Sequence, residues 1–84
     1  MKASSLKKFE DYLNILIYIV HAGHEVGAKE LEEAVTELAR GQLNLDLNAL
    51  VRAEYLISNN KRNARAYTAA EKTKQLFGES NAAN

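Results

Sequence analysis

The sequence predicts a mostly helical α+β domain with three helices, a two-stranded hairpin and a closing helix. Apolar residues recur at three- and four-residue steps through three segments before residue 55, a pattern typical of amphipathic helices. Two short apolar segments then flank the polar stretch 58–63, which indicates a hairpin. The chain of 84 residues has no proline and only four glycines, so long helices are permitted.

The first helix is expected over residues 5–22, with Gly23 as its stop. Its apolar positions form two rows, roughly 130° apart at 100° per residue. The row assigned to the core is Leu6, Phe9, Leu13, Leu16, Ile17 and Val20. One small domain can rarely bury both rows, so the second row is expected to form a homodimer interface. That row is Tyr12, Ile15, Ile19 and Ala22. The alternative is that the N-terminal residues or the closing helix cover it within the monomer.

Two further helices are expected in the middle of the chain. The second begins near Ala28, after a segment too short for more than a turn or a few extended residues, and ends at Gly41. Its buried positions are Leu31, Ala34, Val35 and Leu38. The third spans residues 44–54, where Asn44 and Asp46 can cap the first turn. Its buried positions are Leu43, Leu47, Leu50 and Val51.

The hairpin pairs residues 55–57 with residues 64–67. Asparagine tolerates left-handed backbone, so the three asparagines between the strands supply turn chemistry without glycine. Thr68 and Glu71 form a capping-box pattern that opens a last helix, which ends at Phe77 before Gly78. Residues 1–78 are therefore expected to form one domain, followed by a flexible tail over 79–84.

This order of elements resembles that of a winged helix-turn-helix domain. The chain carries Leu47 and Leu50 before 55–57, then the basic hairpin, and then the pairs 67–68, 71–72 and 76–77. These features are similar to the second half of MarR- and PadR-like transcription regulators, and the similarity covers most of residues 28–77. The sequence departs from these families at Tyr55 and near Thr73, where they usually carry glycine. The resemblance implies duplex DNA binding, with the third helix in the major groove and the hairpin on the backbone or minor groove.

The outward face of the third helix offers a plausible base-reading surface. Asn48 could hydrogen-bond an adenine edge, and Arg52 could bind a guanine or a phosphate. Leu45 and Ala49 could contact thymine methyl groups. The alternative is that this face is merely solvated. The complete set of candidate DNA-binding residues is Lys29, Asn44, Leu45, Asn48, Ala49, Arg52, Lys61, Arg62 and Arg65.

Charge is unevenly distributed along the chain, although 11 basic residues balance 11 acidic ones. The segment from Arg52 to Lys74 carries six basic and two acidic residues, a net charge of +4. Cations in and beside the hairpin turn could neutralise phosphates and give a salt-dependent affinity. The second helix is acidic beyond Lys29, so it cannot lie flat on DNA. A winged-helix adaptor that binds another protein, and no DNA, therefore remains the alternative.

Several other classes are disfavoured. The chain has no cysteine, which excludes disulfides and cysteine-based zinc sites. His21, His24 and Glu25 straddle Gly23 and lack further ligands, so no metal or other cofactor is expected. No nucleophile triad, phosphate loop or evident small-molecule site suggests an enzyme. The apolar run 12–20 is too short to span a bilayer and lacks signal-peptide features. The sequence thus predicts a small cytoplasmic, dimeric transcription regulator of a prokaryote, archaeon or virus.

Overall fold

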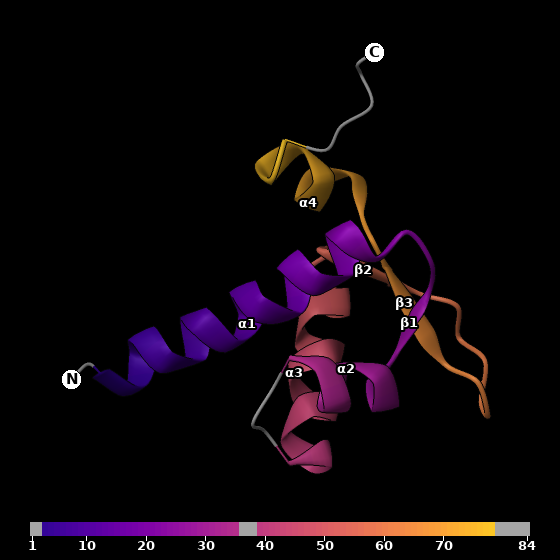
Figure 1. Ribbon diagram of the computed structural model, residues 1–84, viewed down its shortest axis with the longest axis horizontal. Coiled ribbons are helices and arrows are strands. Elements are labelled where there is room, and N and C mark those ends of the chain that lie inside the picture. Colours follow the sequence, from indigo (N-terminus) through magenta and orange to yellow (C-terminus); the bar gives the residue numbers. More distant parts are fainter. Residues whose placement is uncertain (1–2, 36–38, 79–84) are drawn as a thin grey trace.

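The elements follow one another in the order expected, with one short strand added (Figure 1). The structure is a computed structural model that describes residues 3–35 and 39–78. Its elements are α1 (Ala3–Ala22), β1 (Val26–Gly27), α2 (Ala28–Ala34), α3 (Arg40–Arg52), β2 (Leu56–Ser58), β3 (Ala66–Ala69) and α4 (Glu71–Leu76). The predicted α+β class is confirmed. Leu38 and the predicted tail, 79–84, lie outside the described residues.

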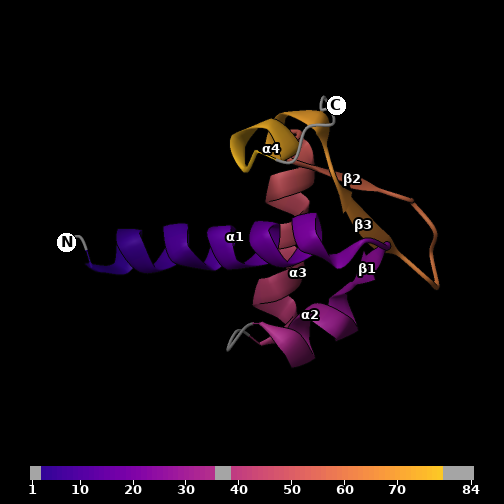
Figure 2. The same ribbon diagram turned by 45° about the horizontal axis from the view of Figure 1, so that its top comes forward.

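The core forms where the C-terminal half of α1, the middle of α3 and the sheet meet. Figures 1 and 2 show the first turns of α1 reaching away from the sheet, while the turn between β2 and β3 projects on the other side. The buried apolar residues come from every element except α4, and they are Ile15, Leu16, Ile19, Val26, Leu31, Leu43, Leu47, Leu50, Leu56, Tyr67 and Ala69. In the described part of the chain, no helix is both long and apolar enough to cross a membrane.

The buried face of α1 differs from the predicted one. Ile15 and Ile19 are 0% and 4% exposed, and Tyr12 and Ala22 pack against the same core. The assignment of Tyr12, Ile15, Ile19 and Ala22 to a dimer interface is therefore wrong, because α1 turns this row toward β3 and the rest of the core. Leu16 is buried as predicted, and Val20 packs against the core.

The other predicted core positions of α1 remain on the surface instead. Leu6, Phe9 and Ile17 are 64%, 57% and 42% exposed, and Leu13 between them is half-buried. We call these four residues the outer row. The core face of α1 therefore combines the row predicted for the dimer interface with Leu16 and Val20, and the outer row is largely uncovered by the residues that the structure describes.

The boundary between α2 and α3 also lies elsewhere than predicted. α2 ends at Ala34, which is exposed, and α3 begins at Arg40, so Gly41 lies in the first turn of α3 and does not stop α2. The residue preceding α3 is Ala39, which makes no side-chain cap. Asn44 and Asp46 are therefore not caps, since both lie inside the helix. Of the seven predicted core positions that the structure describes, Leu31, Leu43, Leu47 and Leu50 are buried, Val35 and Val51 pack against the core, and Ala34 is exposed.

Asp46 is 2% exposed, and its role is to join α3 to α1. Its carboxylate accepts hydrogen bonds from Lys8 Nζ, at 3.0 and 3.2 Å, and from Gln42 Nε2 at 3.1 Å. A buried carboxylate needs such partners to offset its lost hydration. The pair therefore fixes α1 against the middle of α3.

The predicted hairpin is confirmed as β2 and β3, which pair antiparallel with Leu56 opposite Ala69 and Ser58 opposite Tyr67. β1 pairs with the other edge of β3, giving the strand order β1-β3-β2. Thr68 lies in this sheet, so the predicted capping box is wrong, and α4 begins at Glu71 without a side-chain cap. α4 is held instead by Thr73, a fully buried residue whose hydroxyl donates to the Tyr55 carbonyl at 2.6 Å.

Helix ends account for most of the positive backbone angles. Gly23 and Gly78 have φ of 76° and 74°, as expected of helix stops. Glu54 has φ of 71° directly after α3. The N–H of Glu54 donates to the Val51 carbonyl and that of Tyr55 to the Leu50 carbonyl, each at 2.9 Å, which is a Schellman ending with glutamate at the left-handed position.

Replacing Glu54 with glycine is therefore expected to stabilise the fold. A side chain in the left-handed region costs about 1–2 kcal/mol, part of which is offset by the greater freedom of glycine in the unfolded chain. We expect the free energy of unfolding to rise by about 0.5–1 kcal/mol in urea denaturation. Glu54→Ala, which removes the charge but keeps the strain, is the control and should show no such gain. A stability of Glu54→Gly equal to or below that of Glu54→Ala would contradict the prediction.

Candidate nucleic-acid interface

Residues from α3, the start of α2 and the hairpin meet around one polar groove. The groove has a volume of about 350 Å³, and its lining residues are Ala28, Asn44, Asn48, Arg62, Arg65 and Tyr67. We call it the α3 groove. Four candidate DNA-binding residues, widely separated in sequence, thus line a single surface depression.

The remaining candidates lie around the α3 groove and do not line it. Leu45 is 63% exposed, and Arg52, Lys29 and Lys61 are also exposed. Ala49 is half-buried. The predicted outward face of α3 is therefore largely accessible, and Asn48 is the residue of that face that lines the groove, next to Asn44.

The turn between β2 and β3, residues 59–65, is held in shape by the side chain of Asn59. Its Oδ1 accepts from the backbone N–H of Lys61 at 3.0 Å and from that of Ala66 at 3.1 Å, while its Nδ2 donates to the Ala64 carbonyl at 3.0 Å. Asn60 next to it has φ of 60°, the left-handed conformation expected of a turn asparagine. We call residues 59–65 the hairpin turn. The sequence predicted turn-forming asparagines here but did not single out Asn59, whose bond to the N–H two residues on is a common Asx turn.

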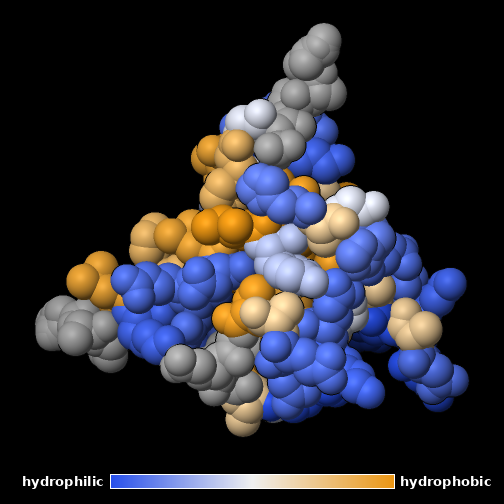
Figure 3. Space-filling view, viewed as in Figure 1, coloured by the Kyte–Doolittle hydropathy of each residue, from blue (hydrophilic) through white to orange (hydrophobic). Residues whose placement is uncertain are grey.

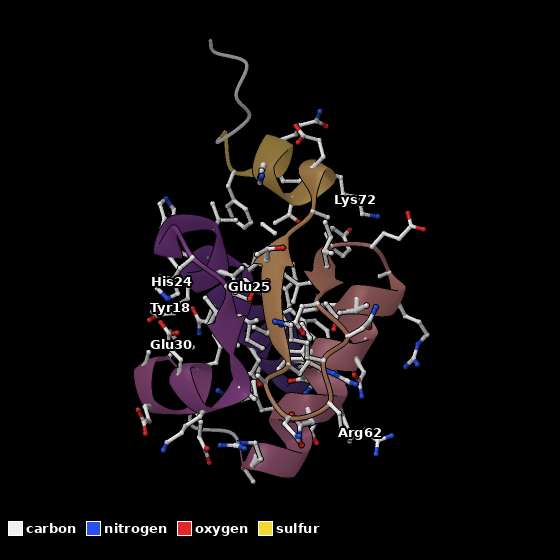
Figure 4. All side chains as sticks on the ribbon, turned by 90° about the vertical axis from the view of Figure 1, so that its right-hand side faces the viewer. Tyr18, His24, Glu25, Glu30, Arg62 and Lys72 are labelled. Atoms are coloured by element: carbon white, nitrogen blue, oxygen red, sulfur yellow. The ribbon has the colours of Figure 1, made fainter. Side chains whose placement is uncertain are left out.

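The cations of the hairpin turn are not neutralised by any residue that the structure describes. Within residues 3–35 and 39–78, Lys61, Arg62 and Arg65 form no ion pair, and Arg65 makes only a long hydrogen bond, 3.4 Å, to the Lys61 carbonyl. Arg40, by contrast, is bound by Glu32 through Nε and Nη2 at 3.0 and 2.7 Å. Figure 4 shows Arg62 beside α3, far from Lys72 at the opposite end of this face.

A second polar cluster lies on the α2 side of the same view (Figure 4). The Tyr18 hydroxyl donates to Glu30 Oε2 at 2.5 Å, and His24 Nε2 lies 3.0 Å from the same oxygen. The Tyr18 hydrogen bond, followed by that of His24, lowers the pKa of Glu30, and the same bond raises the pKa of Tyr18. Among the described residues, no three His, Asp or Glu side chains are grouped so that they could hold a metal ion.

Replacing Tyr18 with phenylalanine is expected to lower stability in a pH-dependent way. A carboxylate with a lowered pKa in the folded state stabilises the fold above its ordinary pKa of 4.5, and this contribution is lost as the pH falls through the folded value. The raised pKa of Tyr18 means that the hydroxyl contributes fully below pH 10.0 and is lost above it. Urea denaturation should therefore give Tyr18→Phe a lower free energy of unfolding than the unaltered protein near neutral pH, and this difference should shrink as the pH falls below 4.5.

The matched control is Tyr12→Phe, because within the described residues the Tyr12 hydroxyl forms no hydrogen bond. The difference in free energy of unfolding between Tyr12→Phe and the unaltered protein should be the same at every acidic and neutral pH. If the difference in free energy of unfolding between Tyr18→Phe and the unaltered protein does not shrink as the pH falls below 4.5, the assigned linkage is refuted.

No protein-family model, curated protein or solved structure matches this chain. The chemistry of the surface itself indicates the class of ligand. Amide side chains of α3 line the α3 groove together with arginines that have no acidic partner among the described residues. Such an arrangement can bind a polyanion and hydrogen-bond to groups within it.

Proposed function

We propose that this protein binds duplex DNA as a small, dimeric winged helix-turn-helix transcription regulator. In this proposal α3 enters the major groove and the hairpin turn contacts the adjacent backbone or minor groove. The observation that carries it is the α3 groove, where Asn44 and Asn48 of α3 lie together with Arg62 and Arg65 of the hairpin turn. These are the two kinds of group that DNA recognition requires, one for base edges and one for phosphates.

The arrangement of the elements supports the same proposal. α2 packs on α3, and β2 and β3 follow with the hairpin turn projecting beyond the body of the molecule (Figure 1). Lys29 at the start of α2 is exposed next to Ala28, which lines the α3 groove. Two acidic residues of α2 are engaged within the protein, Glu30 by Tyr18 and His24 and Glu32 by Arg40, while Glu33 is exposed.

A second copy of the chain is the proposed occupant of the outer row. Figure 3 shows apolar residues following α1 on the side that faces α4. Leu76 of α4 is 67% exposed and adds to this apolar surface. A dimer would also compensate for the neutral overall charge, because two reading helices on one DNA molecule combine their affinities.

The test is fluorescence anisotropy with mixed-sequence duplex DNA at low and physiological salt, with light scattering for oligomeric state. The protein should bind, and affinity should fall steeply with salt. The triple variant Lys61→Ala, Arg62→Ala, Arg65→Ala should bind more weakly and with a smaller salt dependence. Absence of binding even at low salt would overturn the proposal and favour the adaptor, whose partner would then occupy the outer row.

A further inference from the structure

The exposed face of α3 carries an ordered set of side chains. Asn44, Asn48 and Arg52 are spaced four residues apart, so they form one row along the helix. Leu45 and Ala49 form the neighbouring row. From Asn44 to Arg52 the helix rises about 12 Å, which corresponds to three or four base pairs.

The two side-chain amides in this row have no hydrogen-bond partner among the described residues. Asn44 and Asn48 are exposed, and within residues 3–35 and 39–78 neither side chain forms a hydrogen bond. A carboxamide presents a donor and an acceptor side by side, which matches N6 and N7 of adenine in the major groove. Leu45, exposed beside them, has the apolar surface that suits the 5-methyl group of thymine.

α3 itself has no residue that commonly binds guanine at the centre of this face, and the arginines that line the α3 groove, Arg62 and Arg65, come from the hairpin turn. Arginine and lysine are the usual partners of guanine. Arg40, at the start of α3, is bound by Glu32, and Lys8 is bound by Asp46 on the far side of the helix. Arg52 is exposed, but it lies at the C-terminal end of the row.

We propose that α3 reads A·T base pairs at the centre of each half-site, with Asn44 and Asn48 on adenine and Leu45 on a thymine methyl group. This inference rests on the proposed function, since it requires α3 to lie in the major groove. It assigns base recognition to the amide row and leaves the cations of the hairpin turn with backbone contact only. It also places any G·C preference at the edge of the half-site, next to Arg52.

The experiment selects binding sites from a duplex library with a randomised centre and then measures affinity on three forms of the best site. The first is unaltered, the second has central A·T pairs replaced by G·C, and the third has uracil in place of thymine. We expect A·T enrichment at the centre and an affinity loss of about 5- to 100-fold for the G·C form. The uracil form should lose a smaller factor, because it lacks only the methyl group.

Three variants separate the roles. Asn48→Ala should reduce the A·T over G·C ratio, and Leu45→Ala should abolish the difference between thymine and uracil. Arg62→Ala should lower affinity for all three forms by a similar factor and leave their ratios unchanged. The substituted side chains are exposed, so these variants should fold like the unaltered protein. A thermal melt of each variant checks its folding.

Either of two results would overturn the inference while the proposed function stands: selection of G·C pairs at the centre, or equal binding to every duplex. The inference would also be overturned if Asn48→Ala kept the A·T over G·C affinity ratio and Leu45→Ala kept the difference between thymine and uracil. Other residues would then read the bases. Failure to bind any duplex at low salt would overturn the proposed function itself, and the inference with it.

Discussion

Duplex DNA should bind the double variant Arg62→Ala, Arg65→Ala at least about 10-fold more weakly than the unaltered protein at physiological salt. Both arginines line the α3 groove, and neither is paired with a carboxylate among the described residues. Each lost phosphate contact also removes about one unit from the slope of log affinity against log salt. Anisotropy titrations over a range of salt concentrations should therefore give a slope that is smaller by about two.

The matched control removes the same amount of charge from another part of the molecule. Lys72→Ala with Lys74→Ala lowers the net charge equally, but Lys72 lies far from Arg62 and stacks 4.3 Å from the Tyr55 ring centre (Figure 4). This control should bind DNA almost as tightly as the unaltered protein. If both double variants lose affinity equally, the effect is one of total charge, and the α3 groove is not the contact surface.

Replacing Phe9 and Ile17 together with serine should convert the proposed dimer into a monomer. Both side chains belong to the exposed outer row, so the substitutions remove apolar area that the proposed second copy would cover. Burial of such a side chain contributes about 1.5–3 kcal/mol, so the dissociation constant of the dimer should rise at least about 100-fold. Light scattering should report a monomer with unchanged far-UV circular dichroism, and affinity for a duplex with two half-sites should fall as well.

Ile15→Ala on the same helix is the control for this experiment. Ile15 is completely buried, and its truncation should lower the free energy of unfolding by about 2–5 kcal/mol, measured in urea. The serine variant should instead unfold much like the monomeric form of the unaltered protein. A dimer that survives the serine substitutions would exclude the outer row as its interface.

The sequence predicted the elements of the fold better than their faces and boundaries. Periodicity located α1, but a helix that is apolar nearly all round offers two candidate core faces. The choice between Phe9 and Ile15 depends on where β3 packs, which is a tertiary contact that no local pattern contains. Glycine commonly ends a helix, but the backbone of Gly41 does not adopt positive φ, so α3 continues through it.

The candidate site was predicted as a set of residues and not as a surface. Exposure of Leu45, Asn48 and Arg52 followed from the buried leucines of α3, because one face of a helix determines the opposite one. The closeness of Asn44 to Arg65 was not contained in the sequence pattern, since it depends on how the hairpin lies against α3. The bond between Tyr18 and Glu30 was missed for the same reason.

The ion pair between Lys8 and Asp46 connects the proposed dimer helix to the proposed reading helix. α1 carries the outer row on one face and Lys8 on another, and Asp46 lies at the middle of α3. In a dimer joined through α1, the angle between the two copies of α1 would therefore set the separation of the two copies of α3. The preferred interval between half-sites is then a property of the dimer interface, and substitutions that tilt this interface should change the interval while leaving the half-site sequence unchanged.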